Sequence, residues 1–281
     1  MKLTSQSLKI KSSSLLEGVG TENPRKNDCI QQLYEYVEKY KKVDSQKLIS
    51  IILPVYNEEK SIKQVLTNLP KNDMIEIIVV DDHSTDKSLE EIQKVNHKGE
   101  IHIIKHMFNR GYGEALLTGI RHCNGEVFIT MDSDGQHRAE DILNLVKPIF
   151  NGSADITIGS RYKGTFNYKL PIATRLGEAI LEVIIILLFK QKVKNNQGGF
   201  RALHKKTKHI FEEIKFKGYA FTTELILLSV LHKYKIKEVP INLSKREFGS
   251  SYIILRKLIL RLLLCIGLYF FKKAKRILFR R

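Results

Sequence analysis

Short apolar runs alternate with amphipathic stretches through the first half of the chain. The run from Leu48 to Leu53, which Pro54 stops, predicts a buried strand, and a helix is expected from Glu58 to Asn68. The alternation then continues, with strands expected at residues 75–80, 101–105 and 127–130 and helices at residues 84–96, 114–123 and 138–150. This order predicts an α/β fold, in which a mainly parallel sheet is flanked by helices on both faces.

Two segments outside this alternation also have helical periodicity. Residues 1–46 begin polar, and apolar side chains then recur at three- and four-residue steps between Ile30 and Tyr40, which predicts a helical N-terminal extension. Residues 170–189 form a wide apolar stripe that only Arg175, Glu178 and Glu182 interrupt with charge. This stripe is typical of a buried core helix.

The C-terminal segment, residues 252–281, is basic and amphipathic. Its longest uncharged run, Leu262 to Phe271, corresponds to about 15 Å of helix, whereas a bilayer core is about 30 Å thick. A helix lying at an anionic membrane surface therefore fits better than a spanning one, and each basic side chain there would contribute about 1 kcal/mol. A dimerisation helix is an alternative. Nucleic-acid binding is disfavoured, because the aromatic residues are not spread through the basic cluster and no nucleic-acid motif accompanies it.

Composition narrows the choice of partner and compartment. The chain has 281 residues, 43% of them hydrophobic, so a sizeable core is expected. The formal net charge of +17 favours an anionic partner, such as a nucleotide or a phospholipid. The 3 cysteines lack metal-ligand spacing, and no secretory signal peptide is expected. We therefore predict a peripheral protein on the cytoplasmic face of a membrane.

Polar clusters follow three of the predicted strands, at Tyr56-Asn57-Glu58, at Asp81-Asp82-His83-Ser84 and at Asp132-Ser133-Asp134. Ligands of such sheets bind beyond the carboxyl ends of the strands. Two carboxylates and the Gln136 amide suffice for Mg²⁺ or Mn²⁺ if a bound diphosphate supplies the other ligands. Spacing excludes a calcium loop, since His137 stands at its glycine position. Acids at a strand end can also cap the following helix, so each cluster alone is ambiguous.

Two other motifs fail on inspection. Gly111-Tyr112-Gly113 has Leu116 where a dinucleotide-binding loop needs its third glycine, and no phosphate-binding Gly-Lys-Ser/Thr loop exists. Gly113 is better explained by a tight start of the following helix.

Seven short motifs, in this order, carry a family resemblance. They are LPVYNE at residues 53–58, VDDHSTD at 80–86, NRGYG at 109–113, DSDGQ at 132–136, GSRY at 159–162, QGGFR at 197–201 and REFGSS at 246–251. With them the chain resembles the family 2 glycosyltransferases of the GT-A fold, which is Rossmann-like, and most of all the branch of dolichyl-phosphate mannose synthase. His83 and the absence of a Lys after the last motif's serine depart from the family pattern.

The resemblance implies a set of site residues. The nucleotide sugar would be bound by Pro54, Tyr56, Asn57, Glu58, Val80, Asp81, Asp82, Asp132, Ser133, Asp134, Gln136 and Arg161. Within this set, Asp132, Asp134 and Gln136 would hold the metal. Arg175, Arg201 and Arg246 are expected at the acceptor phosphate, because a guanidinium matches phosphate oxygens and stays charged. Asp134, Arg161 and Arg201 are the catalytic candidates. For residues 170–189, the resemblance suggests a helix at a membrane interface beside the lipid acceptor, as an equal alternative to a core helix.

The activity this implies is inverting, metal-dependent transfer of a sugar from a GDP- or UDP-linked donor to polyprenyl or dolichyl phosphate. GDP-mannose, UDP-glucose and UDP-N-acetylhexosamine are all open as donors. A phosphate acceptor is already a strong anionic nucleophile and needs no general base, although Glu224 or Asp141 could act as one. The alternative is transfer to a hydroxyl of a glycan or glycolipid. A non-catalytic relative is disfavoured, because both Asp132 and Asp134 are present.

These inferences divide the chain into four parts. Residues 1–46 form the extension, 47–165 the half that binds nucleotide sugar and metal, 166–251 the acceptor-binding half, and 252–281 the tail that associates with the membrane.

Overall fold

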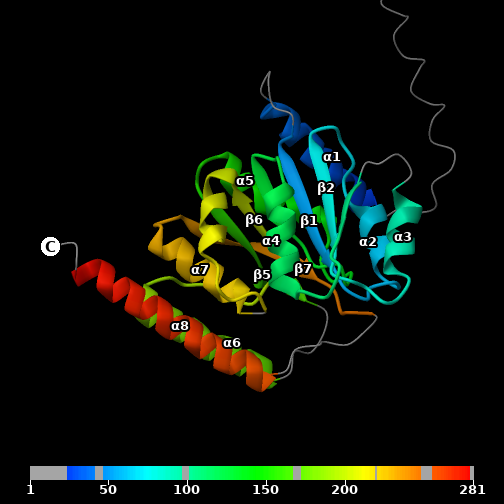
Figure 1. Ribbon diagram of the computed structural model, residues 1–281. Coiled ribbons are helices and arrows are strands. Elements are labelled where there is room, and N and C mark those ends of the chain that lie inside the picture. The colour runs from blue at the N-terminus through cyan, green and yellow to red at the C-terminus, as the bar shows by residue number, and fades with distance from the viewer. Residues whose placement is uncertain are drawn as a thin grey trace, which may run out of the picture.

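The sheet is built around a nearly continuous apolar strand. The computed structural model describes residues 24–41, 47–96, 101–166, 172–218, 220–247 and 255–278. Within them, a seven-stranded sheet has the order β3-β2-β1-β4-β6-β5-β7 (Figure 1). The strands are β1 (Ile49–Val55), β2 (Ile75–Asp81), β3 (Ile101–Lys105), β4 (Val127–Thr130), β5 (Ile156–Phe166), β6 (Arg201–His204) and β7 (Ile236–Leu243). All seven residues of β1 are buried, as expected of a strand with parallel neighbours on both sides and helices on both faces.

Most neighbouring strands are parallel. β1 pairs in parallel with β2 and β4, β2 with β3, and β5 with β7, whereas β6 runs antiparallel to both β4 and β5. The prediction of a mainly parallel α/β sheet is therefore confirmed.

Pro54 does not end β1, so the expected strand end was wrong. The strand continues to Val55, and Pro54 pairs in register with Val80 of β2. On its other side β1 is paired with β4 only as far as Ile52. The carbonyl of Pro54 accepts a hydrogen bond from Ser133 Oγ beyond the end of β4, at 2.8 Å. A missing N–H group therefore breaks no ladder bond on that side.

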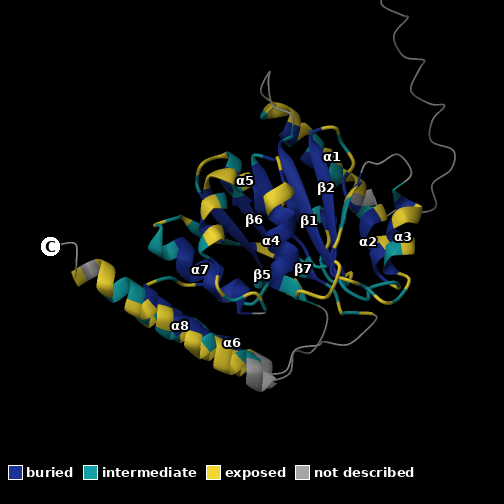
Figure 2. Cartoon of the chain, in the orientation of Figure 1, coloured by how far each residue is buried: buried dark blue, intermediate teal, exposed yellow. Residues whose placement is uncertain are grey.

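Helices cover both faces of the sheet. They are α1 (Pro24–Lys39), α2 (Ile62–Asn68), α3 (Ser88–Val95), α4 (Tyr112–His122), η1 (Ala139–Asp141), α5 (Ile142–Phe150), α6 (Ile172–Phe189), η2 (Lys205–Glu213), α7 (Phe221–Leu231) and α8 (Leu255–Leu278). One core cluster joins the sheet to α1, α2, α3 and α5, and the other joins it to α4, α6, α7 and α8 (Figure 2). Leu33 and Val37 of α1 are buried in the first cluster, so this helix packs on the main core.

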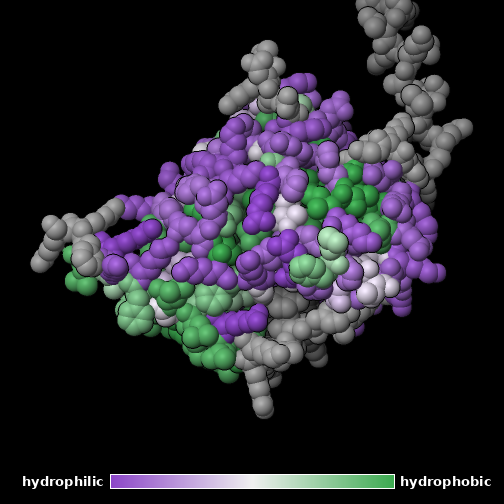
Figure 3. Space-filling model, viewed as in Figure 1, coloured by the Kyte–Doolittle hydropathy of each residue, from purple (hydrophilic) through white to green (hydrophobic). Residues whose placement is uncertain are grey.

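Helices α6 and α8 lie side by side and are each buried along one face only (Figure 1). On α8 the buried residues are Cys265, Ile266 and Tyr269. The exposed hydrophobic residues of the two helices are Leu176, Ile180, Val183, Leu187, Ile259, Leu260, Leu263, Leu264, Leu268, Phe270, Phe271 and Leu278. We call this set the apolar surface, and Figure 3 shows hydrophobic residues gathered along α8. Within residues 175–189 this stripe is thus partly core and partly exposed.

None of the helices in the described residues combines the length and the apolar character that crossing a bilayer requires.

Candidate active site

The polar clusters at the ends of β1, β2 and β4 come together at the carboxyl edge of the sheet. Ser61 Oγ donates to the carbonyl of Ser133 and to Glu58 Oε2, both at 2.9 Å. The backbone N–H of Asn57 donates to Ser84 Oγ at 3.0 Å. These bonds tie the segment after β1 to the segments after β4 and β2. The three polar clusters therefore meet at one edge of the sheet.

Asp132 is held by two side chains from different elements. Tyr112, the first residue of α4, donates through its hydroxyl to Asp132 Oδ1 at 3.0 Å. His137 Nε2 lies 3.1 Å from Asp132 Oδ2. Burial alone would raise the pKa of Asp132, but the hydrogen bonds from His137 and Tyr112 outweigh it, and the pKa lies below its ordinary value. Asp132 is therefore anionic at neutral pH.

Asp134 is held less firmly. Its Oδ1 accepts a hydrogen bond from the backbone N–H of Gln136 at 3.1 Å, and Arg246 Nε lies 3.9 Å from its Oδ2. Burial and the negative charge of Asp132 raise the pKa of Asp134 above its ordinary value. The charged form of Asp132 is thus stabilised by its neighbours, whereas the neighbours of Asp134 do not fully offset the cost of its charge.

Gln136 and Arg246 connect this segment to the end of β7. Gln136 Nε2 donates to the carbonyl of Ser244 at 2.9 Å, which leaves the amide oxygen as the end that could ligate a cation. Arg246 NH2 forms an ion pair with Glu58 Oε1. A cavity of about 340 Å³ opens beside Asp134, and Ser61, Met131 and Ser244 are among its lining residues.

The residues predicted for the nucleotide divide into two groups. Asp81 Oδ1 accepts from the N–H of Ser84 at 3.1 Å, whereas its buried Oδ2 has no hydrogen-bond partner among the described residues. A buried acceptor of this kind fits a ligand that brings an N–H or O–H group. Tyr56 and Glu58 are half-buried at the same edge, and Val80 is buried next to it in β2.

The other group serves the protein itself. Asp82 accepts from the backbone N–H groups of Arg110 and Gly111 at 2.8 and 2.7 Å, and His106 Nδ1 lies 2.6 Å from its Oδ1. Asn57 Oδ1 accepts from the N–H of Thr85 at 2.8 Å. We therefore assign Asp82 and Asn57 to holding the loops after β1, β2 and β3, which positions the nucleotide residues around them.

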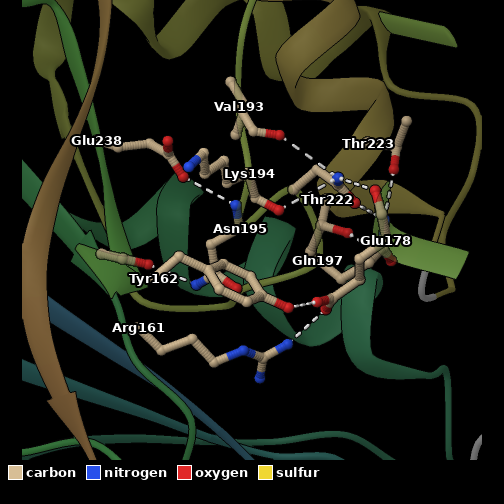
Figure 4. Close-up of polar contacts among 12 residues, drawn as sticks. Arg161, Tyr162, Glu178, Val193, Lys194, Asn195, Gln197, Thr222, Thr223 and Glu238 are labelled. Carbon is tan, nitrogen blue, oxygen red and sulfur yellow. Dashed lines mark hydrogen bonds and ion pairs between the residues drawn. The ribbon is translucent and has the colours of Figure 1, made fainter. Parts of the chain in front are cut away.

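Arg161 belongs to a polar cluster that joins β5 to α6 (Figure 4). Its guanidinium forms an ion pair with Glu178 of α6 at 2.5 Å and lies over the ring of Tyr162, 5.4 Å from the centroid. The hydroxyl of Tyr162 donates to the other oxygen of Glu178. Gln197 is part of the same cluster and donates to Thr223 of α7 at 2.6 Å. Arg161 is thus brought against α6 through Glu178.

Arg201, which follows two glycines, lies in a strand and not in a loop. It begins β6, is 2% exposed, and donates to the carbonyls of Gly198, Thr222 and Asn196 at 2.8, 2.7 and 2.9 Å. Burial lowers its pKa to about 10, and the charges of Tyr112 and Asp132 partly oppose this shift. Its donors hold the backbone around residues 196–198, and this geometry does not support a phosphate-binding role. Arg175 is exposed in the first turn of α6.

Three residues that the sequence reasoning did not select surround Asp132: Tyr112, His137 and Gly199. A Cβ atom on Gly199 would lie 2.5 Å from Asp132 Oδ1 and 2.6 Å from the Tyr112 hydroxyl, so only glycine fits there. The tight helix start expected at Gly113 is confirmed, because its N–H donates to the carbonyl of Lys217 at 2.9 Å and a Cβ would lie 2.5 Å from that oxygen. The GYG motif was the available signal for Tyr112.

The described residues contain no group of three or more His, Cys, Asp or Glu side chains arranged for a metal ion. Two carboxylates and one amide oxygen nevertheless suit a hard cation whose other ligands come from a diphosphate. The raised pKa of Asp134 supports the fit, since a cation would offset the repulsion between the two carboxylates.

Fold and site together define an α/β protein with a cluster of carboxylates at the carboxyl edge of its sheet. The sequence profile described as glycosyl transferase family 2 matches residues 50–211. The chain therefore belongs to glycosyl transferase family 2, and the prediction of a sugar-transferring enzyme is confirmed.

Individual relatives agree with this assignment. The UDP-N-acetylglucosamine–dolichyl-phosphate N-acetylglucosaminyltransferase of Methanococcus voltae is 35% identical over 240 residues, which cover 78% of this chain and 96% of the relative. The dolichol-phosphate mannosyltransferase of Pyrococcus furiosus is 34% identical over 212 residues, 72% of this chain and 58% of the relative. These relatives confirm the resemblance to the polyprenyl-phosphate branch.

A solved structure confirms the GT-A fold. Glucosyl-3-phosphoglycerate synthase from Mycobacterium tuberculosis, crystallised with Mn²⁺, UDP-glucose and phosphoglyceric acid, superposes with a TM-score of 0.61. The match has 20% sequence identity and covers 85% of this chain and 84% of the other.

Proposed function

We propose that this enzyme transfers a sugar from a nucleotide diphosphate sugar to polyprenyl or dolichyl phosphate, with inversion, at a membrane surface. One observation carries the proposal: α6 joins Arg161, one of the predicted phosphate-binding residues, to the apolar surface. Glu178 on its buried side binds Arg161, while Leu176, Ile180 and Val183 are exposed on its other side. A lipid-borne acceptor would meet both surfaces of this one helix. The relatives from Methanococcus voltae and Pyrococcus furiosus are named for transfer to dolichyl and dolichol phosphate, which supports the same acceptor class.

The surroundings of the two acids that could have served as a general base also support a phosphate acceptor. Glu224 is fully buried and accepts from the backbone N–H groups of Lys215 and Phe216 at 2.9 and 2.7 Å, and from the Tyr269 hydroxyl at 2.6 Å. Asp141 accepts from the N–H and the side-chain amide of Asn242 at 2.8 and 3.1 Å. Both acids hold backbone in place. A phosphate nucleophile needs neither, because it is already anionic at neutral pH.

In the proposed reaction, an acceptor phosphate oxygen bonds to the anomeric carbon while the bond from that carbon to the donor diphosphate breaks. The nucleoside diphosphate leaves with the electron pair. Glu58 and Asp81 would accept hydrogen bonds from base or ribose, and Arg161, Arg175 and Arg246 would bind phosphates. A divalent cation held by Asp132, Asp134 and Gln136 would offset the charge of the leaving diphosphate.

The deciding experiment supplies purified protein with polyprenyl phosphate and labelled UDP-N-acetylglucosamine, UDP-glucose or GDP-mannose, with and without chelator. Label that enters the lipid phase, depends on the cation and is released by mild acid supports the proposal. Label in an acid-resistant linkage would instead favour a hydroxyl acceptor. No lipid label from any donor contradicts the proposed acceptor.

Substituting Asp81→Asn should weaken nucleotide binding about 10- to 100-fold. One amide end can still accept from Ser84, but the other then places a donor where the buried, unpartnered Oδ2 offers an acceptor. A hydrogen bond to a charged group is worth about 1.5 to 3 kcal/mol. Calorimetric titration with UDP and GDP measures the effect, and Asp28→Asn, on the exposed side of α1, is the matched control. Equal affinities for the two variants would remove Asp81 from the nucleotide site.

Membrane association is proposed through the apolar surface. The basic side chains of α8 would add attraction to anionic headgroups. We expect the combined substitution Leu260→Ser, Leu263→Ser and Leu264→Ser to reduce binding to vesicles of phosphatidylcholine and phosphatidylglycerol at least about tenfold, because each leucine loses apolar area that the vesicle would bury.

Flotation of protein with these vesicles measures that loss. The three leucines are exposed, so thermal unfolding should change little. Lys63→Ser with Gln93→Ser is the control, because these exposed residues lie on α2 and α3, away from α8 in Figure 1. Full vesicle binding by the leucine variant would rule out α8 as the contact.

A further inference from the structure

Asp132 is enclosed from three directions, whereas Asp134 is not. Tyr112 approaches its Oδ1, His137 approaches its Oδ2, and the backbone of Gly199 leaves no room for a methyl group beside it. Asp134 is contacted by one backbone N–H and, at 3.9 Å, by Arg246. The fold therefore fixes the direction in which Asp132 presents its remaining lone pairs.

The two side chains on Asp132 are themselves fixed by the fold. Tyr112 follows Gly111, whose φ of 90° suits glycine, and the next residue is held by the bond from Gly113 N–H to Lys217. The hydroxyl of Tyr112 is thus aimed by the first turn of α4. His137 has a side chain only 6% exposed, and its ring centroid lies 4.9 Å from that of the buried Phe200.

The imidazole of His137 is costly for the core on its own. Its buried Nδ1 has no hydrogen-bond partner among the described residues, and an unsatisfied buried polar atom costs about 1 to 3 kcal/mol. An apolar side chain would pack against Phe200 without that cost. The polar contact that the His137 ring makes is the one from Nε2 to Asp132.

We propose that Tyr112 and His137 are positioning residues that hold the Asp132 carboxylate in the orientation required by the divalent cation and the diphosphate. The proposal rests on the proposed function, since it assumes that Asp132 serves a cation. Partners that orient a ligating carboxylate or imidazole typically change metal affinity or activity by about 10- to 100-fold when they are removed. Neither residue needs to touch the substrate for such an effect.

The test is a titration with Mn²⁺ in the presence of excess UDP and, in parallel, GDP, followed by the electron paramagnetic resonance signal of free Mn²⁺. Tyr112→Phe removes only the hydroxyl, and His137→Leu removes the ring nitrogens. We expect each to weaken Mn²⁺ binding about 10-fold or more, and to raise the Mn²⁺ concentration for half-maximal transfer equally. His137→Gln, which can place an amide donor near the position of Nε2, should restore part of the affinity.

Thermal unfolding distinguishes positioning from a merely structural role. Tyr234→Phe is the matched control, because it also removes one donating hydroxyl, which bonds to the Lys206 carbonyl at 3.0 Å and not to Asp132. Lower melting temperatures for Tyr112→Phe and His137→Leu together with unchanged Mn²⁺ affinity would overturn the proposal. If the unaltered protein with either nucleotide binds no Mn²⁺, the metal part of the proposed function fails, and this proposal fails with it.

Discussion

Asp134→Asn is expected to lose about 1,000-fold in kcat/KM while the fold is retained. The substitution removes the charge that would hold the cation beside the leaving diphosphate, and a factor of this size corresponds to about 4 kcal/mol of transition-state stabilisation. The assay is label transfer to polyprenyl phosphate at saturating Mn²⁺.

The stability of Asp134→Asn should rise or stay unchanged, although its activity falls. The pKa of Asp134 is raised by burial and by the charge of Asp132, so folding favours its protonated form. A carboxyl with a raised pKa contributes most stability at low pH, and loses that contribution as the pH rises from its unfolded to its folded pKa. At neutral pH the ionised group is a net cost, and the neutral amide should leave the melting temperature equal or higher.

Asp73→Asn provides the control for both measurements, because Asp73 is exposed and precedes β2, at the end of that strand opposite to Asp81. An Asp134→Asn protein that transfers sugar as fast as the control would end the assignment of the cation to this segment. A variant that is inactive because it has unfolded would show a lowered melting temperature, which the pKa argument does not allow.

Arg201→Met is expected to lower the free energy of unfolding by about 3 to 5 kcal/mol. The substitution removes three donors at once and leaves the carbonyls of Asn196, Gly198 and Thr222 buried without their partner. Urea denaturation measures the loss. The free energy of unfolding of Arg201→Lys should lie between those of Arg201→Met and the unaltered protein, since an ammonium group cannot reproduce the fork of a guanidinium.

Arg175→Met is the matched comparison, because Arg175 is exposed and its loss should change stability by less than about 0.5 kcal/mol. If Arg201→Met unfolds like the unaltered protein but requires far more lipid phosphate for half-maximal transfer, the phosphate-binding role predicted from sequence is correct and the structural role is wrong.

The fold of the first half could be predicted because local pattern and tertiary context agree there. Residues 101–105 and 127–130 form strands with the predicted bounds. The expected helix from Glu58 begins only at Ile62, because the intervening backbone is used to contact Ser84, Ser88 and Asp86 across the sheet edge. Strands β5, β6 and β7 were not predicted, since β6 inserts antiparallel between strands distant in sequence, and no local pattern encodes that pairing.

Some residues of the site could likewise be selected from the sequence, and others could not. Acids that follow parallel strands must meet at one edge, so Asp81, Asp132 and Asp134 could be selected from the sequence. Arginines could not be assigned in this way, because a long charged side chain takes its role from whatever the fold places within reach. Arg161 meets Glu178 from α6, and Arg201 meets three carbonyls. Tyr112 and His137 were missed because their importance lies in their contacts with Asp132, which no local sequence pattern encodes.

The docking of α8 through Cys265, Ile266 and Tyr269 has a consequence for how the protein is made. Translation produces α6 and α7 well before α8. The apolar sides of α6 and α7 that pack against α8 are therefore exposed to water until α8 has been synthesised. During this interval the exposed apolar sides of the nascent chain are available for binding to a chaperone or a nearby bilayer. We therefore expect shortened versions lacking α8 to accumulate as insoluble material, even when their catalytic residues are all present.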